Sequence, residues 1–416
     1  MFRRAQRRVL LATSASYLVY YTGRQNLGWA IPGLRIELGL SATEIGWISG
    51  AGLVLYGAGQ LVSGHIADRA GGRRLVALGA VTSCVLNWLT SFGVGFWSLA
   101  IPWALNGYAQ SLGFAPASRL IAAWWAPRER GWAFGVFNFA AGFSSVITFG
   151  TAALVLAWLS WRWVLRLPVL LLLVGAAVVW LFARDRPEEF CLAPRAEEGE
   201  PGPRPRQGDA ADEVTASLGA RLRGAFGNRA FLCASLGFGF ANWARLGLLV
   251  WVPSHLLDNG GAASAGIAWI PLALPAGMAL GALVGGAAVD RFFGGNHPRL
   301  IVLSLVLAAG ATLGLLPAPP DGRRLALLFA AGFFVFGPFP SFTVLGAELL
   351  GPRSVGAGVG FMNAVGYGTA ALGDVVIGAV IDATGRTGAV FAVAATACVL
   401  GAVATALTGA AARQPV

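Results

Sequence analysis

Long apolar segments alternate with short polar segments along the whole chain. Each apolar segment approaches or exceeds the roughly 20 residues that a helix needs to cross a hydrocarbon core about 30 Å thick. One longer polar segment, 184–229, separates the first six apolar segments from the last six and is predicted to be a cytoplasmic linker. The pattern therefore predicts twelve transmembrane helices: 9–34, 44–67, 75–93, 97–125, 131–158, 162–183, 230–257, 264–289, 299–316, 324–350, 354–381 and 387–408.

The two halves of the chain repeat each other. Gly64 and Asp68 recur 222 positions later as Gly286 and Asp290. Because each half has an even number of spans, both halves enter the membrane from the same side and form parallel repeats. We therefore expect an all-α membrane protein with two six-helix bundles, 1–183 and 230–416, and a site between them. A second set of residues recurs 225 positions later: Pro127, Arg128, Gly131, Gly135 and Asn138 as Pro352, Arg353, Gly356, Gly360 and Asn363.

Composition supports a membrane protein. The 416 residues are 56% hydrophobic and only 12% charged, with a mean hydropathy of +0.67, which is outside the range of ordinary soluble domains. The net charge of +11 reports topology rather than nucleic-acid binding, because the arginines gather in segments that lie on one side of the predicted membrane. These segments include Arg3, Arg4, Arg7 and Arg8. The asymmetry predicts a multi-pass inner-membrane protein with both termini in the cytoplasm and the lipid bilayer as its environment.

Two arginines lie inside apolar segments at matching places in the two halves. Arg24 and Arg245 are each followed by a proline eight positions later, Pro32 and Pro253. A charged side chain inside a membrane is costly and usually faces a cavity, a pathway or a partner. Either arginine alone could instead extend toward the interface or pair with a carbonyl. Their equivalent depth favours a shared site for a small anion, and a planar guanidinium suits phosphate oxygens.

Enzyme chemistry has no support in the sequence. The cysteines Cys84, Cys191, Cys233 and Cys398 show no metal-binding spacing, and the three histidines lie near span ends or in loops. We expect no catalytic residues, no metal and no cofactor.

Four stretches carry a more specific signal: YLVYYTGRQNLGWAIPGL, GYAQSLGFAPASRLIAAWWAPRERG, RPEEFCLAP and ANWARLGLLVWVPSHLLD. They resemble the organophosphate:phosphate antiporters of the major facilitator superfamily, such as the bacterial glycerol-3-phosphate and hexose-phosphate transporters. GHIADRAGGRR also matches the loop signature of the superfamily after the second span. The resemblance implies the major facilitator fold, an alternating-access mechanism and a functional monomer.

The resemblance assigns roles to several residues. In that family, arginines at positions matching Arg24 and Arg245 bind the phosphoryl group. Tyr17, Tyr21 and Tyr56 match family tyrosines near the site, although each could instead serve helix packing or an interfacial belt.

The chain also departs from the family pattern. Gln60 stands where glycerol-3-phosphate transporters carry a lysine, Ala141 replaces a histidine and Asn242 replaces a tyrosine. Gln60 and Asn242 could still donate hydrogen bonds to substrate oxygens. The resemblance thus supports an anion exchanger more firmly than any one organophosphate.

Three further charged residues are candidates for coupling or gating. Asp374 is either a counterion or proton carrier that alternates with substrate, or a capped residue that faces water near the exit. Glu348 is expected to pair with a basic loop residue or to close the inner gate. Arg119 is expected to form a structural or gate pair.

Asp68 and Asp290 end the second and eighth spans. In the superfamily such loops are thought to latch neighbouring spans, with the aspartate facing a helix N-terminus. We expect a conformational role for both.

The sequence thus predicts an exchanger of an organic phosphate, of the sugar or glycerol phosphate type, for inorganic phosphate. Two alternatives stay open: a proton-coupled transporter of carboxylates or sugar acids, and a membrane sensor of a phosphorylated sugar.

Overall fold

The structure is a computed structural model of the chain and describes all residues except 1, 191–226, 261–266, 318–319, 351–354 and 412–416. The described residues form helices and short connections, with no strand among them. Most of the predicted linker lies outside the described residues.

The first half contains six predicted spans, of which the first and the last are interrupted. Their helices are α1 (Phe2–Leu18) with η1 (Tyr20–Gly23) and α2 (Leu27–Leu38), α3 (Ala42–Ala70), α4 (Gly72–Ser91), α5 (Phe96–Trp124), α6 (Pro127–Leu156), and α7 (Trp161–Val164) with α8 (Leu170–Phe182). A short 3₁₀ helix, η2 (Pro187–Phe190), follows.

The second half contains the other six spans. Their helices are α11 (Arg229–Gly260), η3 (Ile267–Leu272) with α12 (Ala273–Phe293), α13 (His297–Leu313), α14 (Asp321–Phe336) with α15 (Phe339–Leu350), α16 (Val355–Thr384) and α17 (Ala389–Ala411). The break between α14 and α15 falls at Gly337 and Pro338, where the sequence FGPFP predicts a kink.

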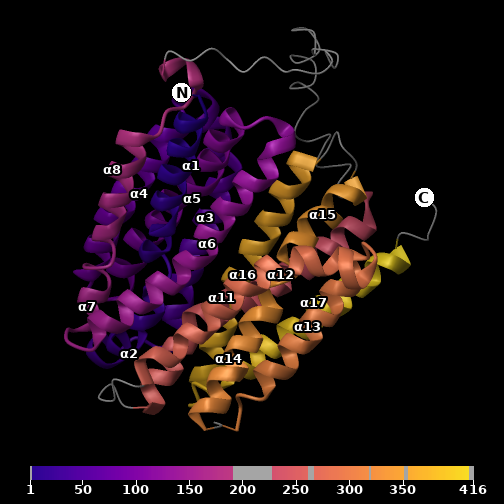
Figure 1. The fold of residues 1–416 in the computed structure, drawn as a ribbon. Coiled ribbons are helices and arrows are strands. Elements are labelled where there is room, and N and C mark those ends of the chain that lie inside the picture. The colour runs from indigo at the N-terminus through magenta and orange to yellow at the C-terminus, as the bar shows by residue number, and fades with distance from the viewer. Residues whose placement is uncertain (1, 191–226, 261–266, 318–319, 351–354, 412–416) are drawn as a thin grey trace.

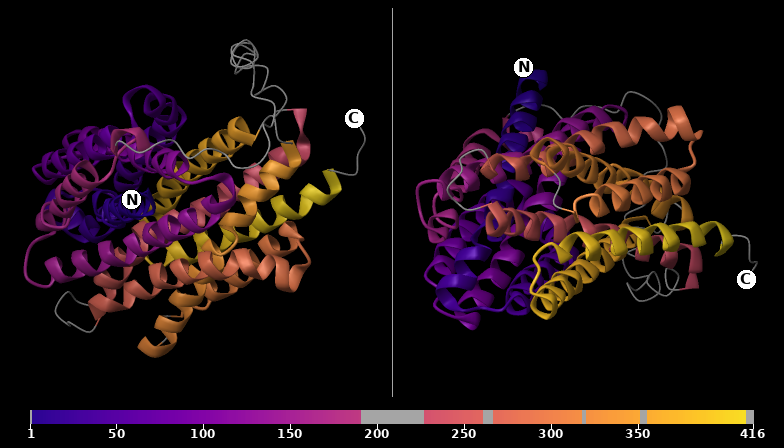
Figure 2. Two further views of the ribbon diagram at one scale, coloured as in Figure 1. Left: turned by 45° about the horizontal axis from the view of Figure 1, so that its top comes forward. Right: turned by 90° about the horizontal axis from the view of Figure 1, so that it is seen from below.

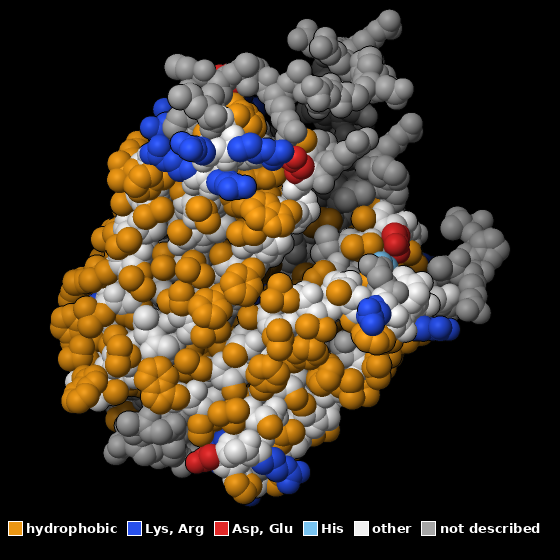
Figure 3. Space-filling view, in the orientation of Figure 1, with side chains coloured by type: hydrophobic (Ala, Val, Ile, Leu, Met, Phe, Trp, Pro, Cys, Tyr) orange, Lys and Arg blue, Asp and Glu red, His pale blue; other side chains and the backbone are white. Residues whose placement is uncertain are grey.

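The helices have the apolar character of membrane spans. Eight helical segments of the described chain are long and apolar enough to cross a membrane. The other four predicted spans are interrupted (α1 with α2, α7 with α8), shorter (α13) or richer in polar residues (α5). Large apolar side chains such as Trp97 and Leu61 are exposed on the flanks, and Figure 3 shows them covering the middle of the molecule, with basic side chains gathered near the N-terminus. This is a multi-pass membrane protein with twelve helical spans.

The two halves form adjacent groups of helices, indigo to magenta and orange to yellow in Figures 1 and 2. We call the end where α1 and α11 begin the terminus end, and the end where α2 and α16 finish the far end. The halves meet where α16 packs on α3, α11 on α2 and α12 on α6.

The buried core shows how the halves are joined. One hydrophobic cluster at the far end combines residues of both halves, including Trp29, Ile45, Leu248 and Ile377. At the terminus end the first half has its own cluster, and the second half has another. The halves are therefore packed together at the far end and form separate cores at the terminus end.

Polar contacts reinforce the far end. The carboxylate of Asp382 on α16 accepts hydrogen bonds from the first backbone N–H groups of α3, at Ala42 (2.9 Å) and Thr43 (2.8 Å), and from the Thr43 hydroxyl (2.6 Å). A carboxylate is favoured at a helix N-terminus because the N–H groups there have no partner within the helix. An ion pair between Arg35 and Asp258 (3.8 Å) joins α2 to α11.

The first span is interrupted at residues 19–26, between α1 and α2. Backbone groups freed by such a break must find partners, because the hydrocarbon offers none. The Gly23 carbonyl accepts hydrogen bonds from the side-chain amides of Asn87 on α4 (2.9 Å) and Asn106 on α5 (2.6 Å). Ser83 donates to Asn106 (2.6 Å). A Cβ atom at Gly23 would collide with the side chains of Ser83 and Gln110, so a larger residue there would displace this polar cluster.

We expect Asn87→Ala and Asn106→Ala to destabilise the protein. Each substitution removes a buried donor to the Gly23 carbonyl, a loss worth about 1–3 kcal/mol. Denaturant unfolding of the purified protein in detergent measures the change. Asn138→Ala is the matched control because Asn138 is exposed, and equal stability of all three variants would contradict the assigned role of the cluster.

We expect Gly378→Ala to open the far end. Its Cβ atom would collide with the Ala42 carbonyl, whereas at Gly368 on the same helix a Cβ has no neighbour within 4 Å. Spin labels at Ile36→Cys and Thr384→Cys, both exposed, report the separation of α2 and α16 in a variant lacking the native cysteines. The distance should increase in Gly378→Ala and stay unchanged in Gly368→Ala, so identical distributions would refute the close packing.

Candidate functional site

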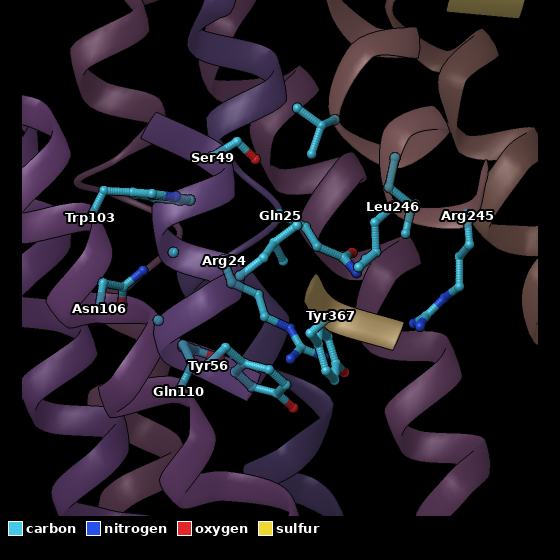
Figure 4. A pocket seen from close by; sticks show the side chains of 15 residues that line it. Arg24, Gln25, Ser49, Tyr56, Trp103, Asn106, Gln110, Arg245, Leu246 and Tyr367 are labelled. Atoms are coloured by element: carbon cyan, nitrogen blue, oxygen red, sulfur yellow. The ribbon is translucent and has the colours of Figure 1, made fainter. Parts of the chain in front are cut away.

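A cavity lies between the two halves, bordered by the break in the first span, α3, α5, α11 and α16. The side chains around it are mostly polar or aromatic and come from both halves. They include Arg24, Gln25, Ser49, Tyr56, Trp103, Asn106, Gln110, Arg245, Leu246 and Tyr367, which Figure 4 labels.

Arg24 reaches the cavity from the interrupted segment. It directly follows η1, and its backbone N–H donates to the Tyr21 carbonyl (3.0 Å). Its guanidinium lies over the ring of Tyr21, 3.9 Å from the ring centre, and over that of Tyr56, at 4.6 Å. Aromatic faces attract a cation while leaving its N–H groups available. The helix break and two rings therefore hold Arg24 in place without neutralising it.

Arg245 reaches the cavity from the continuous helix α11 and is 7% exposed. Its guanidinium lies 4.3 Å from the centre of the Phe336 ring and 5.2 Å from that of Phe339. One N–H group donates to the Asn242 side-chain oxygen (3.4 Å), and the Nε–H has no partner. The two arginines thus occupy different backbone settings although they hold matching sequence positions.

Among the residues that the structure describes, no carboxylate compensates either guanidinium. Within the described part of the chain, neither Arg24 nor Arg245 forms an ion pair. Figure 4 shows both directed into the same space, with Tyr367 between them in that view. A half-buried and a buried guanidinium that face one cavity favour an anion at this place.

Tyr367 is a lining residue that the sequence reasoning missed. Its ring packs edge-on against Tyr56, with the ring centres 4.6 Å apart, and lies within electrostatic range of both arginines. Tyr367 joins α16 to α3 across the two halves. No signal in the single sequence separates it from an ordinary helix-packing tyrosine.

Neutral amides form another part of the lining that the sequence reasoning missed. Gln25 is 6% exposed, and neither its amide nitrogen nor its oxygen has a hydrogen-bond partner. Gln110 donates to Ser83 (2.7 Å), while its oxygen is without a partner. Buried polar atoms rarely stay unpaired, so these amides are available to a ligand. The position of Gln25 directly after Arg24 is the one sequence signal that could have indicated it.

Other predicted residues lie around the lining. Gln60 donates to the Tyr56 hydroxyl (2.6 Å) and so orients that ring. Tyr21 contacts Arg24 as described above, and Tyr17 lies behind it, with its ring edge-on to Tyr21 at 5.8 Å. Tyr17 is 1% exposed and belongs to the core of the first half, as does Ala141.

Asp374 is fully buried on α16. Its carboxyl accepts a hydrogen bond from Ser49 (2.5 Å), a residue of α3 that borders the cavity. One interpretation of the sequence was a capped residue that faces water near the exit, and the burial of Asp374 does not agree with it.

The remaining candidates lie toward the terminus end. Glu348 is exposed and lies 3.8 Å from the Nε2 atom of His297 at the start of α13. Arg119 is half-buried near the end of α5 and interacts with other groups. The side chains of Asp68 and Asp290 lie outside the described residues.

Comparisons with known proteins agree with this architecture. The model of the Major Facilitator Superfamily matches residues 13–373. The membrane sensor protein UhpC of Salmonella typhimurium is 27% identical over 410 residues, covering 95% of this chain and 90% of the relative. A glycerol-3-phosphate transporter of Bacillus subtilis is 25% identical over 425 residues, covering 98% and 93%.

Solved structures share the fold. A bacterial homologue of the human lysosomal transporter Spinster matches with a TM-score of 0.73 at 16% identity, covering 98% of this chain and 96% of that chain. A D-xylose–proton symporter matches with a TM-score of 0.71 at 17% identity, covering 95% and 96%. The family that matches residues 13–373 is one of transporters, and the curated relatives are named as a sensor and a transporter rather than as enzymes. The twelve helical spans of this chain and the match over residues 13–373 establish that the chain belongs to the Major Facilitator Superfamily.

Proposed function

We propose that this protein exchanges an organic phosphate, of the sugar or glycerol phosphate type, for inorganic phosphate across the membrane. The observation that carries the proposal is the pair of uncompensated guanidiniums, Arg24 and Arg245, which border one cavity from opposite halves. Relatives that include a glycerol-3-phosphate transporter and a probable hexose phosphate transport protein support the substrate class.

The two arginines explain why exchange is favoured over one-way transport. Without an anion, two cations facing one cavity repel each other and keep their hydration, which disfavours closure around an empty site. A phosphate between them removes the repulsion, and the planar guanidiniums can each donate paired hydrogen bonds to its oxygens. The bound anion therefore stabilises the closed intermediate through which the carrier changes its direction of access.

The lining amides suit the organic part of such a substrate. Gln25 and Gln110 offer unpaired polar atoms, and amides can both donate to and accept from hydroxyl groups. Tyr56 and Tyr367 supply apolar walls with hydroxyl groups at their ends.

The proposal includes the movement and orientation of the halves. The bundles 1–183 and 230–416 would move as units, with both termini in the cytoplasm and the far end facing outward. Asp68 and Asp290 would latch the loops at the terminus end, and Glu348 and Arg119 would act in its gate. One chain would suffice for transport.

A sensor is the second candidate, because UhpC proteins are among the relatives. A sensor would bind the phosphorylated ligand in the same cavity without moving it across the membrane. Binding and transport must therefore be measured separately.

We expect Arg24→Lys and Arg245→Lys to abolish most phosphate exchange. Lysine keeps the charge but loses the paired donors, and a hydrogen bond to a charged group is worth about 1.5–3 kcal/mol. The apparent affinity for phosphate should fall by about tenfold or more, since 1.4 kcal/mol corresponds to a factor of ten. Uptake of radiolabelled phosphate into proteoliposomes preloaded with phosphate measures the exchange.

Arg7→Lys is the control, because Arg7 is exposed on α1. Vesicles without internal phosphate provide the second control and should take up much less label. Unchanged exchange in both lysine variants would reject the arginine site, and equal uptake by empty vesicles would reject exchange. Phosphate binding without any uptake would favour the sensor, and uptake of carboxylates in place of phosphate would favour the proton-coupled alternative.

A further inference from the structure

A carboxyl group is buried between the two halves at Asp374. Its side chain is 0% exposed, one oxygen accepts the Ser49 hydroxyl at 2.5 Å, and the other oxygen has no hydrogen-bond partner. The Trp251 side chain of α11 interacts with the same carboxyl, although its N–H makes no hydrogen bond of full geometry. One neutral hydroxyl is a poor replacement for the water shell of an ionised carboxylate.

No cation from the described residues compensates this group. Among the described residues, Asp374 takes part in no ion pair, and Arg245, on the neighbouring helix, lies against Phe336 and Phe339. The helices that pack on α16 carry other titratable groups, each with its own surroundings. They include Glu44 in the cap of α3, Tyr56 beside Tyr367, His255 beside Thr387, Asp258 paired with Arg35, Cys233 on α11, Glu348 beside His297 and Cys398 buried in α17, and α16 itself carries Asp382, which is bonded to the start of α3.

Such surroundings favour the neutral form of a carboxyl group over its ionised form. Burial without a cation disfavours the ionised state, and the group binds a proton instead. In that form the carboxylic acid still accepts from Ser49 and carries an O–H donor of its own.

The surface that buries Asp374 is one that alternating access must open. Gly46 on α3 lies directly against the Asp374 carbonyl, and Gly50 lies against that of Ala371, so the helices touch backbone to backbone. These contacts belong to the far end, where the halves share one core. In an alternating-access cycle, opening of the far end would separate α3 from α16 and bring water to the Asp374 carboxyl.

We propose that Asp374 is a proton-binding site that is protonated while the far end is closed and releases its proton when the far end opens. The step is the transfer of H⁺ from the Asp374 carboxylic acid to water, which leaves a hydrated carboxylate; closure requires a proton to return. The inference adds a proton to the transport cycle and so rests on the proposed function for its role, but the protonation itself can be tested without substrate.

Infrared spectroscopy of the purified full-length protein in lipid nanodiscs tests the protonation state. At neutral pH the wild type should show a carboxylic acid C=O band that shifts in D₂O. The band should be absent from Asp374→Asn, should shift in Ser49→Ala, which loses the hydrogen bond, and should persist in Asp321→Asn. Asp321 is a suitable control because its side chain is 67% exposed. Identical spectra of the wild type and Asp374→Asn would overturn the proposal.

Spin labels at Ile36→Cys and Thr384→Cys, measured across a pH series without phosphate, test the coupling to opening. Protonation favours the closed far end, so raising the pH should shift the wild type toward the longer distance, by up to about tenfold in the equilibrium constant per pH unit for one proton. The far end of Asp374→Asn should stay closed at every pH. His255 is still present in this variant, so a loss of the pH dependence cannot be assigned to His255. A pH dependence that persists in Asp374→Asn would overturn the proposal.

The two proposals can fail separately. If the wild type exchanges phosphate but lacks the Asp374 band, the proposed function stands and the proposed proton site is wrong. If opening depends on pH and requires Asp374 but the protein exchanges no phosphate, the proposed proton site stands and the proposed function is wrong.

Discussion

The structure depends on one charged residue inside the membrane, Arg24. The helix that carries Arg24 is interrupted, and this break directs the side chain into the cavity. The break at residues 19–26 frees backbone groups, and hydrocarbon cannot satisfy them. Asn87 and Asn106 supply donors to the Gly23 carbonyl from two neighbouring helices. The same cluster continues through Ser83 to Gln110, which borders the cavity. The polar residues that stabilise the break therefore also shape the site.

The two halves position their arginines at the cavity in different ways. Arg24 is presented by an irregular segment and rests on tyrosine rings, whereas Arg245 projects from a continuous helix and rests on phenylalanine rings. Aromatic faces hold a guanidinium without occupying its N–H groups. In the proposed function, one anion completes both sites at once, so its binding depends on the separation of the halves.

That separation is governed by close backbone contact at one end of the molecule. Small residues such as Gly28, Gly46 and Gly378 let helices of opposite halves touch, and the apolar core at the far end spans both halves. Contacts of this kind depend strongly on distance, so they are either made or lost. Asp382 adds a polar latch to the same surface. The halves are thus joined by close contacts at the far end, while each half keeps a core of its own at the terminus end.

The sequence by itself determined the number of spans, the membrane environment and the family, because each follows from local hydropathy or from short motifs. It also indicated Arg24 and Arg245, since charge inside an apolar segment is costly wherever the helix lies. The interruption around Arg24, the lining by Gln25 and Tyr367 and the contact between Ser49 and Asp374 were decided by the tertiary structure. Tyr367 and Asp374 are separated from their partners by more than half the chain. In the sequence, a polar residue that faces a cavity cannot be distinguished from one that packs against a helix. Only the arrangement of the helices determines which buried polar groups find partners and which remain free for a ligand or a proton.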